Sequence, residues 1–484
     1  MMDDLINSMN DPVDSFDFKS IIPSVDSLYR DEVSNYFQSI DTKFDKETET
    51  IKVESWIEWA KRLKYLKLVN TDVPDWILPK NCSGELIDAK VFCARGPDDS
   101  IYDTYTLVRD RVARGNCFLR ITRGPNKGSR CILYALKKFT GGLGDDDDRD
   151  KGDNVTWKKY FIKPLDAAKR VVATRKANGE AAHMSCIQLD GQFLICAGSK
   201  NVHILIRNRG DISFYKGDRY RIASEVCHSI MDFLENMEAS QKERLLRFLV
   251  VTRFTAVFEI LSPKHQHVEN LSYLDKPVVK FITWTSTELE PMPDQKLCTV
   301  PPHIGIEIAK ALGLSTIDYE VIGSDDIQKR MKQIRQGYQY EGEVLYFLDE
   351  SNIVIGLLKK KTVWYIICRA IREKARSFGA AVIKNKSSYS DSKARSQVEK
   401  RLKDIQEWLG LSDSVIAQWK ELGIAFISWC IKQIEAGIYS MEDIADRFPI
   451  IWKEHLETSQ SSDQINVDHV ECDEVTDLMA AASI

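Results

Sequence analysis

The spacing of apolar residues divides the chain into a polar start, a long middle region and a helical end. Residues 1–50 contain few apolar clusters, which predicts a partly disordered or loosely attached extension. In residues 53–69 the apolar side chains of Trp56, Ala60 and Leu63 recur at helical spacing, which predicts an amphipathic helix.

Short apolar runs rich in β-branched and aromatic residues predict antiparallel strands in the middle region. Runs such as C-F-L-R-I and C-I-L-Y-A-L lie between residues 89 and 139. Residues 181–189 and 192–198 flank Asp190-Gly191, a dipeptide typical of tight hairpin turns. Further strands are predicted at residues 253–261, 277–284, 343–348 and 353–358.

Helical periodicity dominates from Tyr365 onward. The capping sequence S-M-E-D begins one of these helices at Ser440. Residues 459–484 have no lysine or arginine and little periodicity, which predicts an acidic, disordered tail. The predicted fold class is therefore α+β, with antiparallel-rich sheets followed by a C-terminal helical domain.

Composition and charge narrow the choice of function. The 484 residues include no apolar run near the roughly 18 that a membrane span requires, so we predict an intracellular protein, cytoplasmic or nuclear, with no membrane partner. Eleven cysteines without a C-x-x-C pair fit a reducing compartment and give no zinc signature. Although the net charge is −5, residues 359–403 hold 14 lysines and arginines against three acidic residues, which predicts a polyanion site.

Lys176 opens the tetrad K-A-N-G and is the leading candidate for a nucleophile. A lysine attacks only in its neutral form, which burial or neighbouring cations favour. Lys359 and Lys361 occupy alternate strand positions, so they would point the same way, favour the neutral form of Lys176 and hold a nucleotide α-phosphate.

Two carboxylates and two glycines are candidates for the same cleft. Glu259 ends an apolar run and Glu341 precedes a strand, so both would lie at a cleft rim. A carboxylate beside phosphates suits Mg²⁺, and one on a neighbouring strand suits ribose hydroxyls. Gly179 and Gly342 would let the backbone approach a nucleotide, where a Cβ would obstruct it.

Two other patterns are less favoured as sites. Asp145–Asp148 lies in the polar segment 141–154, which predicts a loop rather than a metal site. His265 and His267 have metal-ligand spacing, but they lie in a polar loop without a third ligand nearby. No P-loop sequence occurs, so no separate NTPase module is predicted.

Five motifs in a set order carry a family resemblance. They are K-A-N-G at 176–179, G-S-K at 198–200, T-A-V-F-E at 255–259, E-G-E-V at 341–344 and L-K-K-K-T-V-W-Y at 358–365. Together they resemble motifs I, Ia, III, IV and V of covalent nucleotidyltransferases, and most of all the phage-type RNA ligase 1 family and the adenylyltransferase domain of fungal tRNA ligases. Arg114-Gly115 and Lys138-Phe139 resemble the R-G and K-F elements upstream of motif I.

The resemblance implies a nucleotidyltransferase domain with sheets around an ATP cleft, and ATP and Mg²⁺ (or Mn²⁺) as cofactors. Lys176 would accept AMP, Glu259 would contact the ribose and Glu341 would hold the metal. Lys359 and Lys361 would bind the α-phosphate. Arg114 and Lys138, upstream of motif I, and Lys200 in motif Ia would contact the triphosphate tail or an RNA phosphate. The nucleotide-binding residues implied besides Glu259 are Arg114, Lys138, Asn178, Gly179, Lys200, Lys359 and Lys361.

On this resemblance the chain joins RNA 5′-phosphate and 3′-hydroxyl ends through a lysyl-AMP intermediate and an adenylylated RNA end. The implied parts are an extension at 1–50, an RNA ligase adenylyltransferase domain at 51–375, a helical domain at 376–458 and a tail at 459–484. A DNA ligase, an RNA capping guanylyltransferase and an inactive RNA-binding paralogue are the alternatives. The natural RNA, its use in repair or tRNA splicing, the oligomeric state and the role of Arg175 beside the nucleophile stay open.

Overall fold

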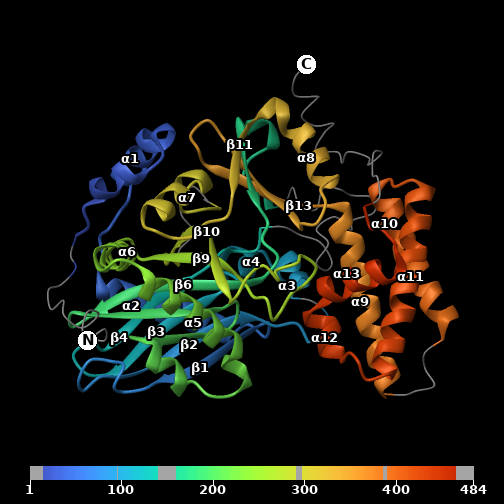
Figure 1. Cartoon of the computed structure of the whole chain (residues 1–484). Helices are drawn as coiled ribbons and strands as arrows, with labels where there is room; N and C mark the ends of the chain where they lie inside the picture. The colour runs from blue at the N-terminus through green and yellow to red at the C-terminus, as the bar shows by residue number, and fades with distance from the viewer. Residues whose placement is uncertain are drawn as a thin grey trace.

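The computed structural model describes residue 13 and residues 15–464, except 95, 97, 140–159, 290–296 and 385–389. It is an α+β structure in which three antiparallel sheets and their helices form one lobe and helices α9–α13 form the other (Figure 1). The predicted loop at 141–154 with Asp145–Asp148, and residues 465–484 of the predicted tail, lie outside the described residues.

The first sheet has the strand order β1-β2-β3-β4. Its strands are β1 (Leu66–Val73), β2 (Ser83–Val91), β3 (Asn116–Arg123) and β4 (Gly128–Tyr134). Helix α2 (Lys46–Lys61) packs on it through Trp56 and Ile57, and α3 (Asp99–Thr104) and α4 (Thr106–Arg111) connect β2 to β3. The predicted helix at 53–69 is therefore too long: its last residues pair with β2, a distant partner that local spacing cannot reveal.

The second sheet has the order β10-β9-β6-β7-β8. Its strands are β6 (Glu180–Leu189), β7 (Gln192–Ser199), β8 (His203–Ile206), β9 (Phe254–Leu261) and β10 (Val278–Ser286). The predicted hairpin at Asp190-Gly191 is confirmed, and both turn residues have the positive φ that a two-residue turn requires. Short helical segments η5 (Arg209–Phe214) and η6 (Asp218–Tyr220) follow β8.

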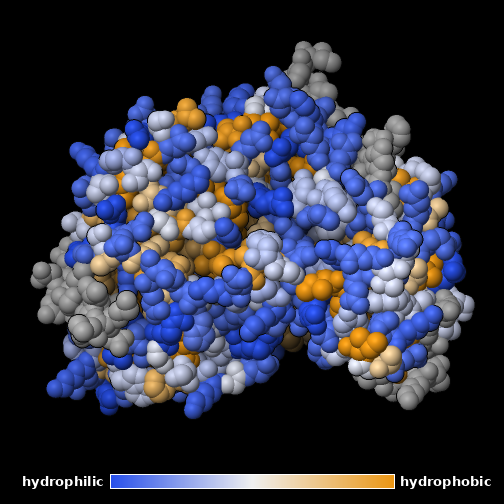
Figure 2. All heavy atoms as spheres, viewed as in Figure 1, coloured by the Kyte–Doolittle hydropathy of each residue, from blue (hydrophilic) through white to orange (hydrophobic). Residues whose placement is uncertain are grey.

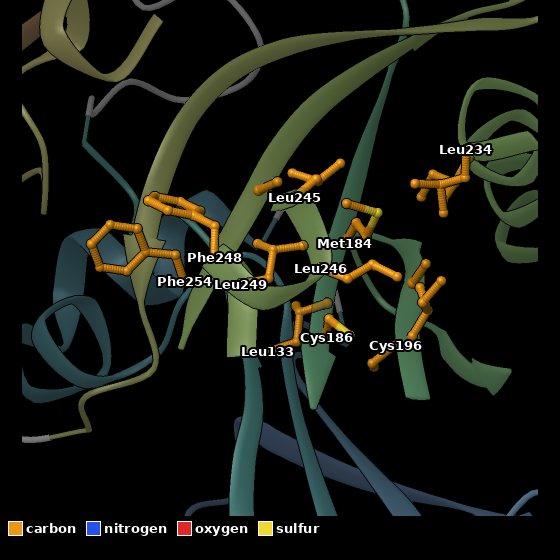
Figure 3. Packing of buried hydrophobic residues seen from close by; sticks show 14 of the residues in the cluster. Leu133, Met184, Cys186, Cys196, Leu234, Leu245, Leu246, Phe248, Leu249 and Phe254 are labelled. Atoms are coloured by element: carbon orange, nitrogen blue, oxygen red, sulfur yellow. The ribbon is translucent and has the colours of Figure 1, made fainter. Parts of the chain in front are cut away.

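The largest core lies between the first two sheets and the helices that cover them. These helices are α5 (Arg221–Asn236), α6 (Ala239–Thr252) and α7 (Pro302–Ala311). Figure 3 shows Leu246 and Leu249 of α6 close to Met184 and Cys186 of β6, with Leu133 of β4 beside them. The two sheets are thus held together by apolar burial, the main favourable term in folding.

The third sheet has the order β11-β5-β12-β13. Its strands are β5 (Arg170–Arg175), β11 (Tyr319–Gly323), β12 (Gly342–Leu348) and β13 (Val354–Lys361). Separate apolar clusters cover its two faces, one of them with helix α8 (Ile327–Arg335), while η4 (Leu165–Ala167) precedes β5 and η7 (Ser324–Asp326) precedes α8. Burial on both faces explains why β12 is almost continuously apolar and why β13 is apolar up to Leu358, before its three final lysines.

The N-terminal residues are attached to the core rather than loose. η1 (Phe18–Ser24), η2 (Ser27–Tyr29) and α1 (Arg30–Gln38) pack on the main core through the fully buried Ile21 and Val33. The prediction for residues 1–50 is therefore wrong for the part that the structure describes. Its apolar residues are few in sequence, yet Ile21, Val25 and Val33 are buried in the main core.

The helical lobe comprises α9 (Val363–Lys384), α10 (Asp391–Leu409), α11 (Asp413–Glu435), α12 (Met441–Asp446) and α13 (Phe448–Ser459). It has its own apolar core, which already includes residues of the first turn of α9. The helical part thus begins at Val363, directly after β13, and the predicted boundary at 375/376 cuts through α9. The predicted capping at Ser440 is confirmed.

The first residues of the predicted tail are also anchored. The buried carboxylate of Asp463 accepts hydrogen bonds from the indoles of Trp364 and Trp452, both at 2.8 Å, and from the Tyr338 hydroxyl at 2.6 Å. A disordered segment beginning at residue 459 is therefore wrong for 459–464.

Candidate active site

The K-A-N-G tetrad crosses from one sheet to another. Lys176 directly follows β5 of the third sheet, and Gly179 directly precedes β6 of the second sheet. The Lys176 backbone N–H donates to the Gly342 carbonyl at 2.9 Å, which ties the tetrad to the start of β12. The candidate nucleophile thus lies where the two sheets meet.

The glycines at this junction are required by neighbouring backbone. A Cβ on Gly179 would lie 2.1 Å from the Ile260 carbonyl oxygen, and one on Gly342 would lie 2.1 Å from that of Lys360. Gly342 also has a φ of +145°, which L-residues with a side chain rarely adopt. Both glycines therefore allow strands to approach closely, and the expectation that they also make room for a nucleotide stays a prediction.

Lys176 forms an ion pair with Glu341, which precedes β12. Its Nζ lies 2.7 Å from Glu341 Oε1, and the side chains are 21% and 4% exposed. Burial raises the pKa of Glu341, but Lys176 and Lys361 outweigh it and hold that pKa below its usual value. Glu341 is therefore ionised and pairs with a lysine that still reaches solvent.

Asn178 orients the Glu341 carboxylate. Its side-chain N–H₂ donates to Glu341 Oε2 at 2.7 Å and to the Tyr365 hydroxyl at 3.2 Å. Its Oδ1 accepts from the backbone N–H groups of Val268 and Glu269. Asn178 is thus a buried positioning residue whose hydrogen-bonding groups are occupied by protein.

Glu259 of β9 is the second carboxylate at the tetrad. Its Oε1 accepts from the Gly179 backbone N–H at 3.1 Å. Burial raises the pKa of Glu259 to about 7, with Lys176 lowering it and Glu341 raising it. At neutral pH the two carboxylates near Lys176 therefore differ, because Glu341 is ionised while Glu259 is close to half-protonated.

Lys359 and Lys361 lie on the same side of β13, as predicted from their alternation. Both line the cleft, whereas Lys360 between them does not. Lys359 Nζ lies 4.9 Å from the centre of the Phe139 ring, and Lys361 Nζ lies 5.7 Å from that of Tyr365. Lys361 also acts electrostatically on Glu341, so the cationic strand is coupled to the Lys176 ion pair.

The cations Arg114, Lys138 and Lys200 meet at the first turn of α3. Lys138 Nζ lies 2.6 Å from Asp99 Oδ1, and Lys200 Nζ lies 2.6 Å from Asp98 Oδ2. Arg114 contacts both aspartates, at 3.1 Å and 3.7 Å. The structure therefore brings the three predicted cations together, but around two aspartates that no sequence motif singled out.

One cleft of about 610 Å³ unites the predicted residues. It lies between the second sheet, the third sheet and helix α9. Predicted residues lining it are Arg114, Lys138, Lys176, Asn178, Gly179, Lys200, Glu259, Glu341, Lys359 and Lys361. Residues that were not predicted but also line it include Asp99, His183, Tyr365, Arg369, Arg372 and Arg376.

Three of the arginines that line this cleft, Arg369, Arg372 and Arg376, lie on one face of α9 because their spacing follows the helical repeat. Arg372 Nε donates to the Ala445 carbonyl at 3.2 Å, and burial followed by repulsion from Arg376 lowers the pKa of Arg372 to about 10. Arg369 Nε lies 3.2 Å from Glu373. The helical spacing of these arginines within the basic segment 359–403 is the sequence signal from which they could have been predicted.

Arg175 and the two loop histidines now have partners. Arg175 pairs with Glu269 at 3.0 Å and stacks over the Tyr340 ring at 4.1 Å, so its side chain braces the strand that carries Lys176. His265 lies near Glu225 and Asp446, at 3.9 Å and 3.5 Å. His267 lies 3.6 Å from Glu180 and lines the cleft.

Comparison with known proteins places this cleft within a family. Residues 87–372 match DUF7920, described as a domain of unknown function. The chain belongs to the DUF7920 family. The matched segment contains all of the predicted site residues and extends into α9 as far as Arg372. No curated protein and no solved structure matches the chain.

The described helices include none that is both long and apolar enough to cross a bilayer. The face seen in Figure 2 is mainly hydrophilic, with hydrophobic side chains in small groups, and its outline is indented between the two lobes.

Glu259→Gln should remove a pH dependence of stability. The native state keeps the Glu259 proton up to about pH 7, whereas the unfolded chain releases it near 4.5. Between these values the native state binds more protons, so stability falls as pH rises. Relative to wild type, the variant should gain on the order of 2 kcal/mol between pH 5 and pH 8, allowing for solvent in the cleft.

Thermal melts of both proteins across that pH range measure this difference. Glu238→Gln, at an exposed position before α6, controls for the change in net charge. Parallel curves for wild type and Glu259→Gln would show that the Glu259 carboxyl titrates normally.

Proposed function

We propose that the chain is an ATP-dependent RNA ligase that joins 5′-phosphate and 3′-hydroxyl ends through a lysyl-AMP intermediate. The observation that carries the proposal is the Lys176–Glu341 ion pair, 2.7 Å long, inside a cleft walled by Lys359 and Lys361. Such a lysine has access to a ligand, a carboxylate partner and a cationic field, which are the needs of a phosphoramidate-forming nucleophile. The nucleotidyltransferase fold of the sheets is part of the same proposal.

The cleft suits a nucleotide in size and lining. Its volume of about 610 Å³ lies within the usual range for small-molecule pockets. Apolar side chains for a nucleobase come from Val268, Ile282, Ile317 and Val344. Cations for the phosphates lie on β13 and around Asp98 and Asp99, so base and phosphates would have distinct parts of the wall.

In the first step Lys176 Nζ attacks the α-phosphorus of ATP and pyrophosphate leaves. The attacking amine must be neutral, and Glu259, with a pKa of about 7, suits the role of proton acceptor. Lys359 and Lys361 would stabilise the charge that develops on the α-phosphate. This adds a proton-transfer role to the ribose contact that the resemblance implies for Glu259.

Glu341 fits the predicted Mg²⁺ site because its carboxylate is held ionised and offers hard oxygen donors at the cleft wall. Mg²⁺, when bound, supplies charge neutralisation on the phosphates and on the leaving pyrophosphate. Glu341 itself positions Lys176, and Asn178 keeps Glu341 in place.

In the later steps the RNA 5′-phosphate takes AMP from Lys176, and a 3′-hydroxyl then attacks the activated end and expels AMP. Each step is an in-line displacement that depends on alignment and neutralised charge. The arginine face of α9 borders the cleft, where the RNA phosphate would have to enter. RNA is favoured over DNA because a terminal 2′-hydroxyl can be recognised.

Labelling distinguishes this function from its alternatives. The full-length protein is incubated with Mg²⁺ and α-labelled ATP or GTP, and acid-resistant label on the polypeptide is measured. Label from ATP, transferred to 5′-phosphate RNA and followed by joining, is expected. Label from GTP would favour a capping enzyme, equal sealing of DNA a DNA ligase, and RNA binding without label an inactive paralogue.

The arginines of α9 should matter more for RNA joining than for lysine labelling. Arg369→Ala with Arg376→Ala removes two cations from the cleft while leaving Arg372, which holds Ala445. We expect labelling from ATP within about threefold of wild type and joining reduced about tenfold or more at physiological salt, since each phosphate contact strengthens binding.

Lys400→Ala with Lys403→Ala is the matched control. These exposed lysines of α10 belong to the same basic segment but do not line the cleft. An equal loss of joining in both double variants would show that charge over the whole segment, rather than the α9 face, guides RNA.

A further inference from the structure

A buried cluster of metal-ligating side chains lies beneath the cleft, between the first two sheets. It consists of Asp88 on β2, Cys117 on β3 and His203 on β8. Asp88 is 1% exposed and the other two are fully buried. One carboxylate oxygen, the thiol sulfur and one imidazole nitrogen all lie within 4.8 Å of one another. In the part of the chain that the structure describes, this is the one such group.

The contacts of the cluster hold its donors in place. His203 Nδ1 lies 2.7 Å from Asp88 Oδ1, and the His203 backbone N–H donates to Asp88 Oδ2 at 3.2 Å. On the other side of the ring, His203 Nε2 lies 3.2 Å from His183 Nδ1. A metal-binding histidine is usually oriented by a hydrogen bond from its second nitrogen, and His183 is placed to accept it.

A further sulfur lies next to the cluster. The Cys117 thiol is within hydrogen-bonding reach of both Asp88 and Cys196, and Cys196 is a buried residue of β7. Figure 3 shows Cys196 in the packed interior of the main core. One thiol, one imidazole and one carboxylate thus converge from three strands of two sheets, and Cys196 on β7 adjoins the Cys117 thiol outside this group of three.

We propose that Asp88, Cys117 and His203 bind a structural Zn²⁺ ion and that the Cys196 thiol, which adjoins Cys117, moves toward them as the fourth ligand. Thiolate and imidazole donors in a closed, buried set are typical of tetrahedral zinc sites. Binding replaces the two thiol protons, which leave to solvent, with Zn–S bonds, so the site has a net charge of −1 beside Arg219, whose guanidinium lies 3.6 Å from Asp88. Zinc bond lengths place light ligand atoms roughly 3.3 Å apart, so Asp88 and His203 separate by about half an ångström.

The ion connects the two sheets that support the cleft. His183, which orients His203, also lines the cleft, and a Cβ on the neighbouring Gly115 would lie 2.5 Å from its ring. The zinc site therefore braces the wall that carries Arg114. This role goes beyond the lysine chemistry and does not depend on it, since none of the four ligands lines the cleft.

Metal analysis of the full-length protein tests the proposal. Purified without chelators, it should contain about one zinc per chain by mass spectrometry of the elements. Cys117→Ser and His203→Gln should lower the zinc content at least fivefold, whereas Cys186→Ser, a buried cysteine of the same core outside the cluster, should retain it.

Because a core variant can fail to fold, the wild-type protein supplies a second measurement. After removal of metal, Co²⁺ alone should produce a thiolate charge-transfer band, and Zn²⁺ should abolish that band and raise Tm. Zinc content below one tenth per chain with neither band nor Tm shift would overturn the proposal. Unchanged zinc content in folded Cys117→Ser would overturn it too. Neither result would bear on the ATP-labelling experiment, because that experiment tests the lysine chemistry independently.

Discussion

Lys176→Ala is expected to abolish covalent labelling by α-labelled ATP, a loss of at least about 1,000-fold, because no other described amine occupies the position between Glu341 and the cationic strand. Lys176→Arg should be equally inactive, since a guanidinium stays protonated at neutral pH. Labelling is measured on denaturing gels after acid treatment.

The arginine variant separates chemistry from folding. Alanine leaves the buried Glu341 carboxylate without its partner and should lower Tm, whereas arginine can still pair with it. Lys169→Ala, an exposed lysine just before β5, is the control and should label normally. Persistent label in folded Lys176→Arg would place the adduct elsewhere and remove the basis for the proposed function.

Lys359→Ala or Lys361→Ala should each slow adenylylation by about 10²–10³-fold, the usual cost of losing a preorganised charge at a developing anion. Single-turnover labelling at saturating ATP isolates this step. Lys361 helps to keep Glu341 ionised. Its replacement should therefore also weaken the ion pair between Lys176 and Glu341, whereas replacement of Lys359 should leave that pair intact.

Lys360→Ala is the matched control for this strand. Lys360 lies between the two lysines but outside the cleft lining, and it is buried, so the variant tests whether a lost strand lysine acts through stability alone. Rates are compared at equal fractions of folded protein, determined by thermal melts. If all three variants label alike, the alternation along β13 has no catalytic meaning.

Local sequence patterns predicted most of the strands, because the alternation of side chains and the turn residues involve only neighbouring positions in the chain. The Asp190-Gly191 turn and its flanking runs specify a hairpin without help from the rest of the fold, and the alternation in β13 places Lys359 and Lys361 on one side. The motifs likewise singled out residues that line one cleft, although these residues lie far apart along the chain. Their identities and order were visible before any geometry.

Contacts between distant segments were beyond such reasoning. Residues 66–69 continue a helical spacing, yet pairing with β2 makes them a strand. Apolar residues are sparse between residues 15 and 38, but Ile21 and Val33 are fully buried in the main core, so this polar segment is packed against the fold. In each case the burial that decides the structure is supplied by a partner far along the chain.

The site shows the same division. The sequence by itself determined the chemical types at the cleft: a lysine, two carboxylates and a basic strand. Only the tertiary structure decided that Asp98 and Asp99 neutralise the outer cations, that Arg175 is held by Glu269 and Tyr340, and that Asp88, Cys117 and His203 meet between two sheets. The physical reason is that side-chain chemistry belongs to single residues, whereas electrostatic partners and buried ligand sets arise only when sheets from separate parts of the chain pack together.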